Sequence, residues 1–140
     1  MAKKQKMWTT FIGAKLALFL GRRLLVYRRD DRPDIPWPNT WDLPGGGREP
    51  GEGPWACAQR ETFEEFGLRV PRTTVTKLAH HRLSPTGEPA VFVVAHMPPS
   101  CRGRIKFGEE GQHWKTMSRH EFLRSSKAIP HLQHLVAKHG

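Results

Sequence analysis

The chain has 140 residues and a formal net charge of +10, from 23 Lys and Arg against 13 Asp and Glu. This length suits one domain with a hydrophobic core and is short for two. No run approaches 18 uninterrupted apolar residues, which excludes a predicted membrane-spanning helix, and two cysteines exclude a disulfide framework. We therefore expect one domain over residues 1–140, with residues 1–7 as a flexible basic tail.

The positive charge lies mainly toward the two ends. Residues 1–32 carry nine Lys and Arg against two acids, residues 33–99 six against eight, and residues 100–140 eight against three. Such a field favours anionic substrates and allows RNA as a partner. A basic surface that serves only solubility fits the charge equally well. The basic N-terminus has no clear small-residue cleavage site after it, so a cytoplasmic location is predicted.

The first predicted element is an antiparallel hairpin. Residues 9–20 are largely apolar, and after a short turn containing Gly21 the run from Leu24 to Arg29 repeats the pattern. Residues 30–40 contain three prolines and predict a loop. Trp37 on this loop could cover a base or a sugar, whereas Trp41 after it is expected to pack in the protein.

A helix is predicted from Pro54 to about Phe66. Pro54 suits a first helical position, and Gly67 suits the left-handed residue that follows a last turn. At 100° per residue, one face holds the carboxylates of Glu61, Glu64 and Glu65. The other face, expected to be the core side, holds Trp55, Gln59, Thr62, Phe63 and Phe66.

The carboxylate face of this helix needs a partner. Like charges at i,i+4, such as Glu61 and Glu65, destabilise a helix slightly. Carboxylates on a rigid element are what Mg²⁺ or Mn²⁺ binds together with substrate phosphates. The preceding Gly45, Gly46 and Gly47 allow backbone to approach a cation and a polyanion closely. For the helix taken alone, a solvated Arg- and Glu-rich face is the alternative.

Further strands and helices are predicted in the second half. Residues 74–82 and 89–97 are strand candidates, and the run Val91 to Ala95 is apolar enough to be buried on both faces. Residues 98–108 predict a basic loop that could lie over a cleft. A strand before Ser118, a short helix capped by Ser118 and a last helix from Pro130 to about His139 complete the chain.

Two residue types invite a metal or redox interpretation. Cys57 lies beside the carboxylates on the helical wheel, either as a small packing residue or as a reactive thiol. His131 and His134 share a helix face, but without a third ligand at a fitting spacing solvent-facing histidines are expected rather than a zinc site.

Seven residues of the central stretch have a type and spacing that resemble the signature of the Nudix hydrolases: Gly46, Glu52, Arg60, Glu61, Glu64, Glu65 and Gly67. Seven fixed types at roughly 1 in 15 each give a chance match on the order of 10⁻⁸ per starting point. Thr62, where the pattern has an aliphatic residue, is the one departure, and its methyl group can still face the core. The resemblance implies the Nudix fold, an α/β/α sandwich with a mixed sheet of about five or six strands.

The resemblance also implies roles for individual residues. It suggests metal binding by Glu61, Glu64 and Glu65 with the Gly45 carbonyl and an additional acid, Glu110 or Glu109, between which spacing alone does not choose. It makes Arg29 the favoured phosphate-binding arginine over Arg28, with Gly46 and Gly47 beside the substrate. Glu52 and Arg60 are expected to form an ion pair that holds the glycine loop on the helix.

The expected activity is metal-dependent hydrolysis of a diphosphate linkage in a nucleoside diphosphate linked to a further group X, with Mg²⁺ or Mn²⁺ as cofactor. Two alternatives remain: an RNA 5′-end pyrophosphohydrolase, and a non-catalytic domain that binds nucleotides or RNA. A nucleotide-type substrate is the expected partner, RNA is a second, and a homodimer is left open.

Overall fold

The computed structural model describes residues 10–140, so the predicted tail lies outside the described residues. The elements are β1 (Gly13–Leu20), β2 (Arg23–Arg28), β3 (Trp41–Asp42), β4 (Gly45–Gly47), α2 (Pro54–Phe66), η1 (Arg72–Thr74), β5 (Val75–Arg82), β6 (Pro89–Met97), η2 (Pro99–Arg104), β7 (His113–Ser118), α3 (Arg119–Arg124) and α4 (Pro130–His139). Each predicted strand and helix is therefore present, with bounds within a few residues. No helix in the described part of the chain is long and apolar enough to cross a membrane.

The strands form one mixed sheet. Its order is β3-β2-β1-β6-β5, with β7 paired to β2 and β4 paired to β1. β1 and β6 run parallel, and the other pairs are antiparallel. The sheet has seven strands among residues 10–140, rather than the predicted five or six, because the glycine loop itself pairs with β1 as β4.

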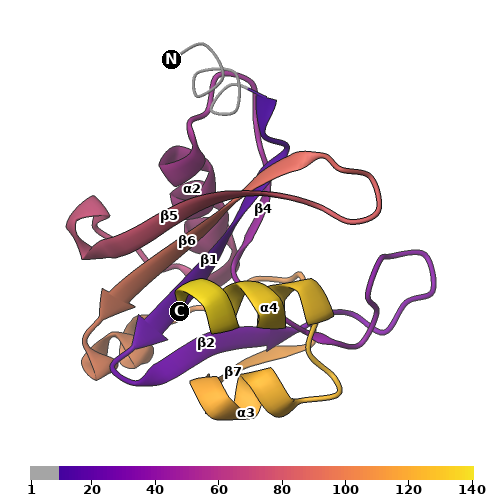
Figure 1. Cartoon of the computed structure of the whole chain (residues 1–140). Coiled ribbons are helices and arrows are strands. Elements are labelled where there is room, and N and C mark those ends of the chain that lie inside the picture. The colour runs from indigo at the N-terminus through magenta and orange to yellow at the C-terminus, as the bar shows by residue number, and fades with distance from the viewer. Residues whose placement is uncertain (1–9) are drawn as a thin grey trace.

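The sheet lies between two helical layers, which confirms the α/β/α architecture. Figure 1 shows α3 and α4 in front of the sheet and α2 behind it. One core cluster contains Cys57, Ala58 and Phe66 of α2, and a second contains side chains of α3 and α4. Strand β6 supplies both clusters by alternation, so it is buried on both faces as predicted.

The helix boundaries follow from their end residues. Pro54 opens α2, and Gly67 adopts φ 66° after its last turn, where its N–H donates to the Phe63 carbonyl. The Ser118 hydroxyl accepts from the Glu121 N–H and caps α3, as predicted. These local signals fix where the elements start and stop.

The predicted core face of α2 is partly wrong. Phe63 is 40% exposed and lies under the Arg69 guanidinium, whereas Glu65 is buried. The buried face is centred closer to Ala58, so it overlaps the carboxylate face instead of opposing it. Thr62 is fully buried and its hydroxyl donates to the Ala58 carbonyl at 2.7 Å, which lets its methyl group replace an aliphatic residue. The overlap places one carboxylate of the helix at the edge of the core.

Candidate active site

An open cleft of about 700 Å³ lies where α2, β4 and the segment before β7 meet. It is lined by Lys15, Tyr27, Arg29, Gly45, Gly46, Gly47, Glu61, Glu64, Glu65, Gly108, Glu109 and Glu110. The glycine loop, the three helix acids, Arg29 and both candidate additional acids were predicted to belong to one site. The structure brings them together.

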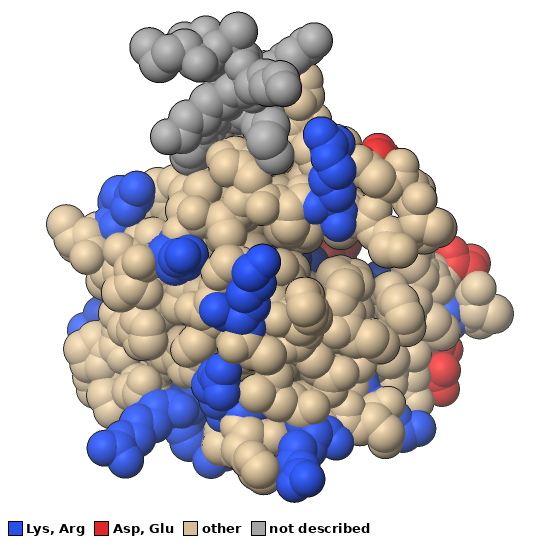
Figure 2. All heavy atoms as spheres, viewed as in Figure 1, with Lys and Arg blue, Asp and Glu red and all other residues tan. Residues whose placement is uncertain are grey.

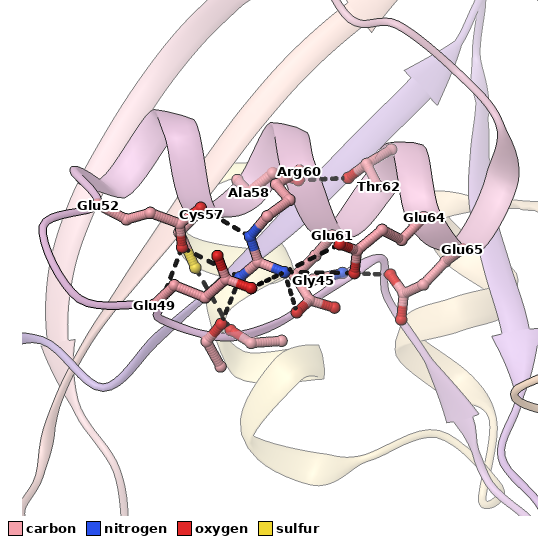
Figure 3. Close-up of polar contacts among 12 residues, drawn as sticks. Gly45, Glu49, Glu52, Cys57, Ala58, Arg60, Glu61, Thr62, Glu64 and Glu65 are labelled. Atoms are coloured by element: carbon pink, nitrogen blue, oxygen red, sulfur yellow. Dashed lines mark hydrogen bonds and ion pairs between the residues drawn. The ribbon is translucent and has the colours of Figure 1, made fainter.

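Arg60 lies at the centre of the acidic side chains (Figure 3). Its Nε donates to Glu52 Oε2 at 2.7 Å, which is the predicted ion pair. Its Nη1 donates to Glu61 Oε1 at 2.9 Å and lies 3.2 Å from Glu64 Oε2. Its Nη2 donates to the Gly47 carbonyl at 2.8 Å. Arg60 therefore ties the glycine loop to α2 and also neutralises two of the carboxylates expected to bind metal, a contact that the sequence did not predict.

These contacts shift the ionisation of the group. The hydrogen bond from Arg60 lowers the pKa of Glu52 below its ordinary value, and the same bond raises the pKa of Arg60. Glu52 also accepts from the Glu49 N–H at 2.9 Å, so the turn before α2 is fastened at two points. The loop and the helix are held as one unit by charge-assisted hydrogen bonds.

Glu65 occupies a different environment from Glu61 and Glu64. It is 9% exposed, and its Oε1 accepts from the Gly45 N–H at 2.8 Å. Burial raises the pKa of Glu65 to about 8, against the opposing effects of Lys15 and that hydrogen bond. Burial also raises the pKa of Glu61. Water therefore solvates these carboxylates poorly. A bound cation would stabilise their negative charge.

The glycines are required by close backbone contacts. Gly45 has φ 129°, and a Cβ there would lie 2.1 Å from the Ala14 carbonyl oxygen. A Cβ on Gly46 would lie 2.6 Å from Glu61 Oε2. A Cβ on Gly47 would meet nothing within 4 Å. Two of the three glycines therefore let β1 and the Glu61 carboxylate approach the loop.

A buried charge network under the loop was missed by sequence reasoning. Asp42 is 1% exposed, and its Oδ2 accepts at 3.0 Å from Lys15 Nζ, from Tyr27 Oη and from Arg29 Nη1. Burial alone would raise the pKa of Asp42, but Lys15 and Arg29 hold it below its ordinary value. Lys15 Nζ also donates to the Gly45 carbonyl at 3.3 Å. A lone lysine inside the apolar β1 run was the available signal.

The donor set fits hard divalent cations in a particular way. Among residues 10–140, no three His, Cys, Asp or Glu side chains form a ready metal cage. Glu61 and Glu64 contact Arg60, and the Gly45 carbonyl accepts from Lys15. Mg²⁺ is commonly held by one or two carboxylates plus substrate phosphates rather than by a closed protein site. The open carboxylate-lined cleft suits ions that arrive with a phosphorylated substrate.

The remaining predicted residues have mixed outcomes. Arg29 lines the cleft, whereas the Arg28 guanidinium lies over the Trp41 ring. Glu109 and Glu110 both line the cleft, and the negative charge of Glu110 contributes to the raised pKa of Glu61. Both acids therefore stay candidates for the additional metal ligand. Trp37 is exposed but is not among the residues that line the cleft.

Two other expectations near the cleft are settled by packing. Cys57 is fully buried, and burial raises the pKa of its thiol to about 11, so the reactive-thiol interpretation is wrong. Of the segment 98–108, only Gly108 is among the residues that line the cleft, and the buried Cys101 anchors η2 in the core. Gly108 reaches the cleft lining by donating its N–H to the Glu65 carbonyl at 2.8 Å.

A family model described as the NUDIX domain matches residues 12–137. The chain belongs to the Nudix family. Its Nudix relatives include proteins named RNA pyrophosphohydrolase from Rhodopseudomonas palustris (strain BisB18), 33% identical over 105 residues, and from Bradyrhizobium diazoefficiens, 40% identical over 105 residues. These matches cover 74% of this chain and 50% and 53% of those proteins. The chain thus spans about half the length of these curated relatives.

Solved Nudix-type structures share the fold. The MutT protein from Methanosarcina mazei Go1 superposes with a TM-score of 0.68 at 17% identity, over 93% of both chains. An Ap4A hydrolase binary complex from C. elegans gives a TM-score of 0.67 at 21% identity, over 90% of this chain and 93% of that one. At these sequence identities, the similarity shows a shared fold and nothing further.

Proposed function

We propose that the protein hydrolyses a diphosphate linkage in a nucleoside diphosphate linked to a further group, with Mg²⁺ or Mn²⁺ as cofactor. The observation that supports this most is the cleft in which Glu61, Glu64 and Glu65 face a glycine loop with a free approach from solvent. Membership of the Nudix family supports the same chemistry. The cytoplasmic location remains a prediction from the sequence.

Each cleft residue has a role in this proposal. Glu61, Glu64 and Glu65, with the Gly45 carbonyl and Glu110, would hold the ions. Bound ions would neutralise phosphate charge and lower the pKa of the attacking water. A cleft carboxylate would accept the proton of that water as the water oxygen bonds to one phosphorus and the P–O bond from that phosphorus to the leaving group breaks.

The positive side chains of the cleft orient the substrate. Arg29 and Lys15 are each about a quarter exposed and reach the cleft from the Asp42 network, so they can meet phosphate oxygens at its wall. Gly46 and Gly47 allow the substrate to lie against backbone. Glu52 and Arg60 position the loop and the helix acids rather than react.

A 5′-triphosphorylated or diphosphorylated RNA is the second candidate substrate. Relatives named RNA pyrophosphohydrolase favour it, and so does the net charge of +10. Both candidate substrates would be cleaved at a diphosphate linkage. They differ in the group linked to the nucleoside diphosphate, which is an RNA chain in the second candidate.

A substrate screen tests the proposal. Nucleoside triphosphates, dinucleoside polyphosphates, nucleotide sugars and triphosphorylated RNA are incubated with Mg²⁺ or Mn²⁺, and released phosphate and pyrophosphate are measured. Turnover of at least one class that disappears with a chelator and in Glu65→Gln is expected. Binding without turnover of any class would instead make the protein a non-catalytic nucleotide or RNA binder.

A further inference from the structure

A second concave surface is lined by residues of β5, the turn after it and α4. Figure 1 shows α4 on the side of the sheet away from α2. The concave surface encloses about 240 Å³, and its basic and imidazole side chains include His81, Arg82, His131, His134 and Lys138. We call this surface the histidine groove. It is separate from the catalytic cleft and contributes nothing to the chemistry described above.

The two walls of the groove follow from strand and helix periodicity. On β5, His81 has the same parity as Ala79, which pairs with Phe92 of the core cluster beneath α4. On α4, the side chains at i, i+3 and i+7, His131, His134 and Lys138, form one stripe about 10 Å long. The fold therefore aligns His81 with this stripe although they are about 50 residues apart in sequence. Arg82, the last residue of β5, has the opposite parity and lies at the rim of the groove, where its Nη1 donates to the Gly87 carbonyl at 2.9 Å.

The groove has little negative charge to balance it. β5, β6 and α4 contain Lys77, Arg82, Lys138 and six of the eight histidines, and none of the three elements contains Asp or Glu. The nearest acid along β5 and β6 is Glu88 in their connecting turn. Figure 2 shows Lys and Arg side chains spread over this face, with the few visible acids toward its right side. Burial lowers the pKa of His81, His131 and His139, so the positive charge of this face comes from its Lys and Arg side chains, and these attract an extended anion.

A continuous path joins the groove to the catalytic cleft. Between them lies a mostly apolar pocket of about 270 Å³. It shares Lys15, Gly46 and Gly47 with the cleft, and it shares His81, Leu83 and His131 with the groove. Burial lowers the pKa of His131, and Asp42 and Lys15 of the cleft network also act on it. His131 thus lies between the two surfaces.

An exposed aromatic side chain stands at this junction. Trp37 is 46% exposed, and its ring centroid lies 6.4 Å from that of His131. Single-stranded RNA is held by stacking of its bases on aromatic side chains together with basic contacts to its backbone. Trp37 and His131 supply the rings on which a base can stack. Arg82 and Lys138 supply the basic contacts to the RNA backbone.

We propose that the histidine groove binds the phosphodiester backbone of a single-stranded RNA whose phosphorylated 5′ end lies in the catalytic cleft. The proposal rests on the proposed function and names its substrate class. A mononucleotide reaching the cleft and the apolar pocket has no further phosphate to place between β5 and α4. A chain of two or more nucleotides does.

Length-graded substrates test the groove. kcat and KM are measured for a nucleoside triphosphate and for 5′-triphosphorylated oligoribonucleotides of two, three and six residues. The wild-type kcat/KM should rise with length and then level off. In Arg82→Ala/Lys138→Ala, the ratio of kcat/KM for the hexamer to that for the mononucleotide should fall about 10-fold or more, through KM, because two phosphate contacts are lost.

A matched control removes the same charge elsewhere. Arg124 and Lys127 are exposed and do not line the groove, so Arg124→Ala/Lys127→Ala should keep the wild-type ratio. Circular dichroism melts of both double variants establish that they fold, and Arg82→Gln/Lys138→Gln serves as a second groove variant. A wild-type kcat/KM that is independent of length, or equal losses in the control, would overturn the proposal.

Binding gives a readout that does not need turnover. Fluorescence anisotropy with a 5′-monophosphorylated hexamer should give a salt slope that flattens by about 1.4 in the groove variant, at 0.7 per lost contact. If no substrate is turned over, the proposed function fails while this slope still tests the groove. An unchanged slope, or stronger competition by an acidic peptide than by RNA, would reject the RNA assignment.

Discussion

The catalytic cleft and the histidine groove use charge in opposite ways. In the cleft, Arg60 is 22% exposed and contacts Glu52, Glu61 and Glu64, so three carboxylates of the protein neutralise its charge. In the groove, Arg82 and Lys138 are exposed and their elements carry no acid. Compensated charges fix geometry, and uncompensated ones attract ligand. Changes in the cleft should therefore affect the rate, and changes in the groove should affect affinity in a salt-dependent way.

The largest effect is expected from the helix carboxylates. Glu64→Gln and Glu65→Gln should each lower kcat by at least ~10², because each removes a charged metal ligand while keeping side-chain shape. A Gln at 65 can still accept from the Gly45 N–H, so the fold should persist. Metal titrations of both variants measure the loss, and full turnover in both would remove the metal-binding role from this helix face.

The glycine loop offers a matched pair of variants. Gly45→Ala should destabilise the protein by at least ~2 kcal/mol, because its Cβ would clash with the Ala14 carbonyl at an unfavourable φ. Gly47→Ala has open space and should change stability little. Urea unfolding of both proteins makes the comparison. Equal midpoints for the two variants would show that the loop is not held against β1.

The buried network should contribute to stability and to its pH dependence. Asp42→Asn should lower the free energy of unfolding by about 1–2 kcal/mol. The loss is smaller than for a fully buried ion pair because Lys15 and Arg29 are partly exposed. The folded pKa of Asp42 is below its unfolded value of ~3.9, so its contribution is present above that pH and is lost as pH falls through the folded pKa. The difference from wild type should shrink below about pH 4. Asp34→Asn, in an exposed pair with Arg32, is the control and should leave the unfolding midpoint unchanged.

The smallest effect is expected from the positioning residue. Arg60→Ala should lower kcat by about 10-fold, since loss of an outer partner commonly costs 10–100-fold. Its contacts with Glu61 and Glu64 also suggest that metal affinity changes with the rate. Kinetics over a range of metal concentrations separate these terms. A loss as deep as that of Glu65→Gln would place Arg60 in direct contact with the reaction.

The sequence predicted the elements whose signals are local. Pro54, Gly67 and Ser118 mark helix ends, and the spacing from Gly46 to Gly67 marks the cleft, because each of these signals lies within one continuous stretch of chain. The burial of Glu65 was not predicted, since the core face of a helix depends on how the helix sits on the sheet. The pairing of the glycine loop as β4 depends on β1 in the same way.

Residues far apart in sequence were the harder part of the site. Lys15 meets Asp42 across 27 positions, and no spacing rule connects them. The histidine groove joins β5 to α4, so the shared helix face of His131 and His134 had no visible partner before the fold placed His81 opposite it. Composition indicated an excess of positive charge, but only the tertiary structure shows where that charge is concentrated.

The contrast between cleft and groove can be measured in one experiment. kcat and KM for a triphosphorylated RNA hexamer are determined at low and high salt for wild type, Glu65→Gln and Arg82→Ala/Lys138→Ala. We predict that Glu65→Gln loses kcat by at least ~10² at both salt concentrations, whereas the groove variant loses affinity at low salt and much less at high salt. A groove variant that loses kcat, or a Glu65→Gln protein that keeps it, would contradict this division of roles.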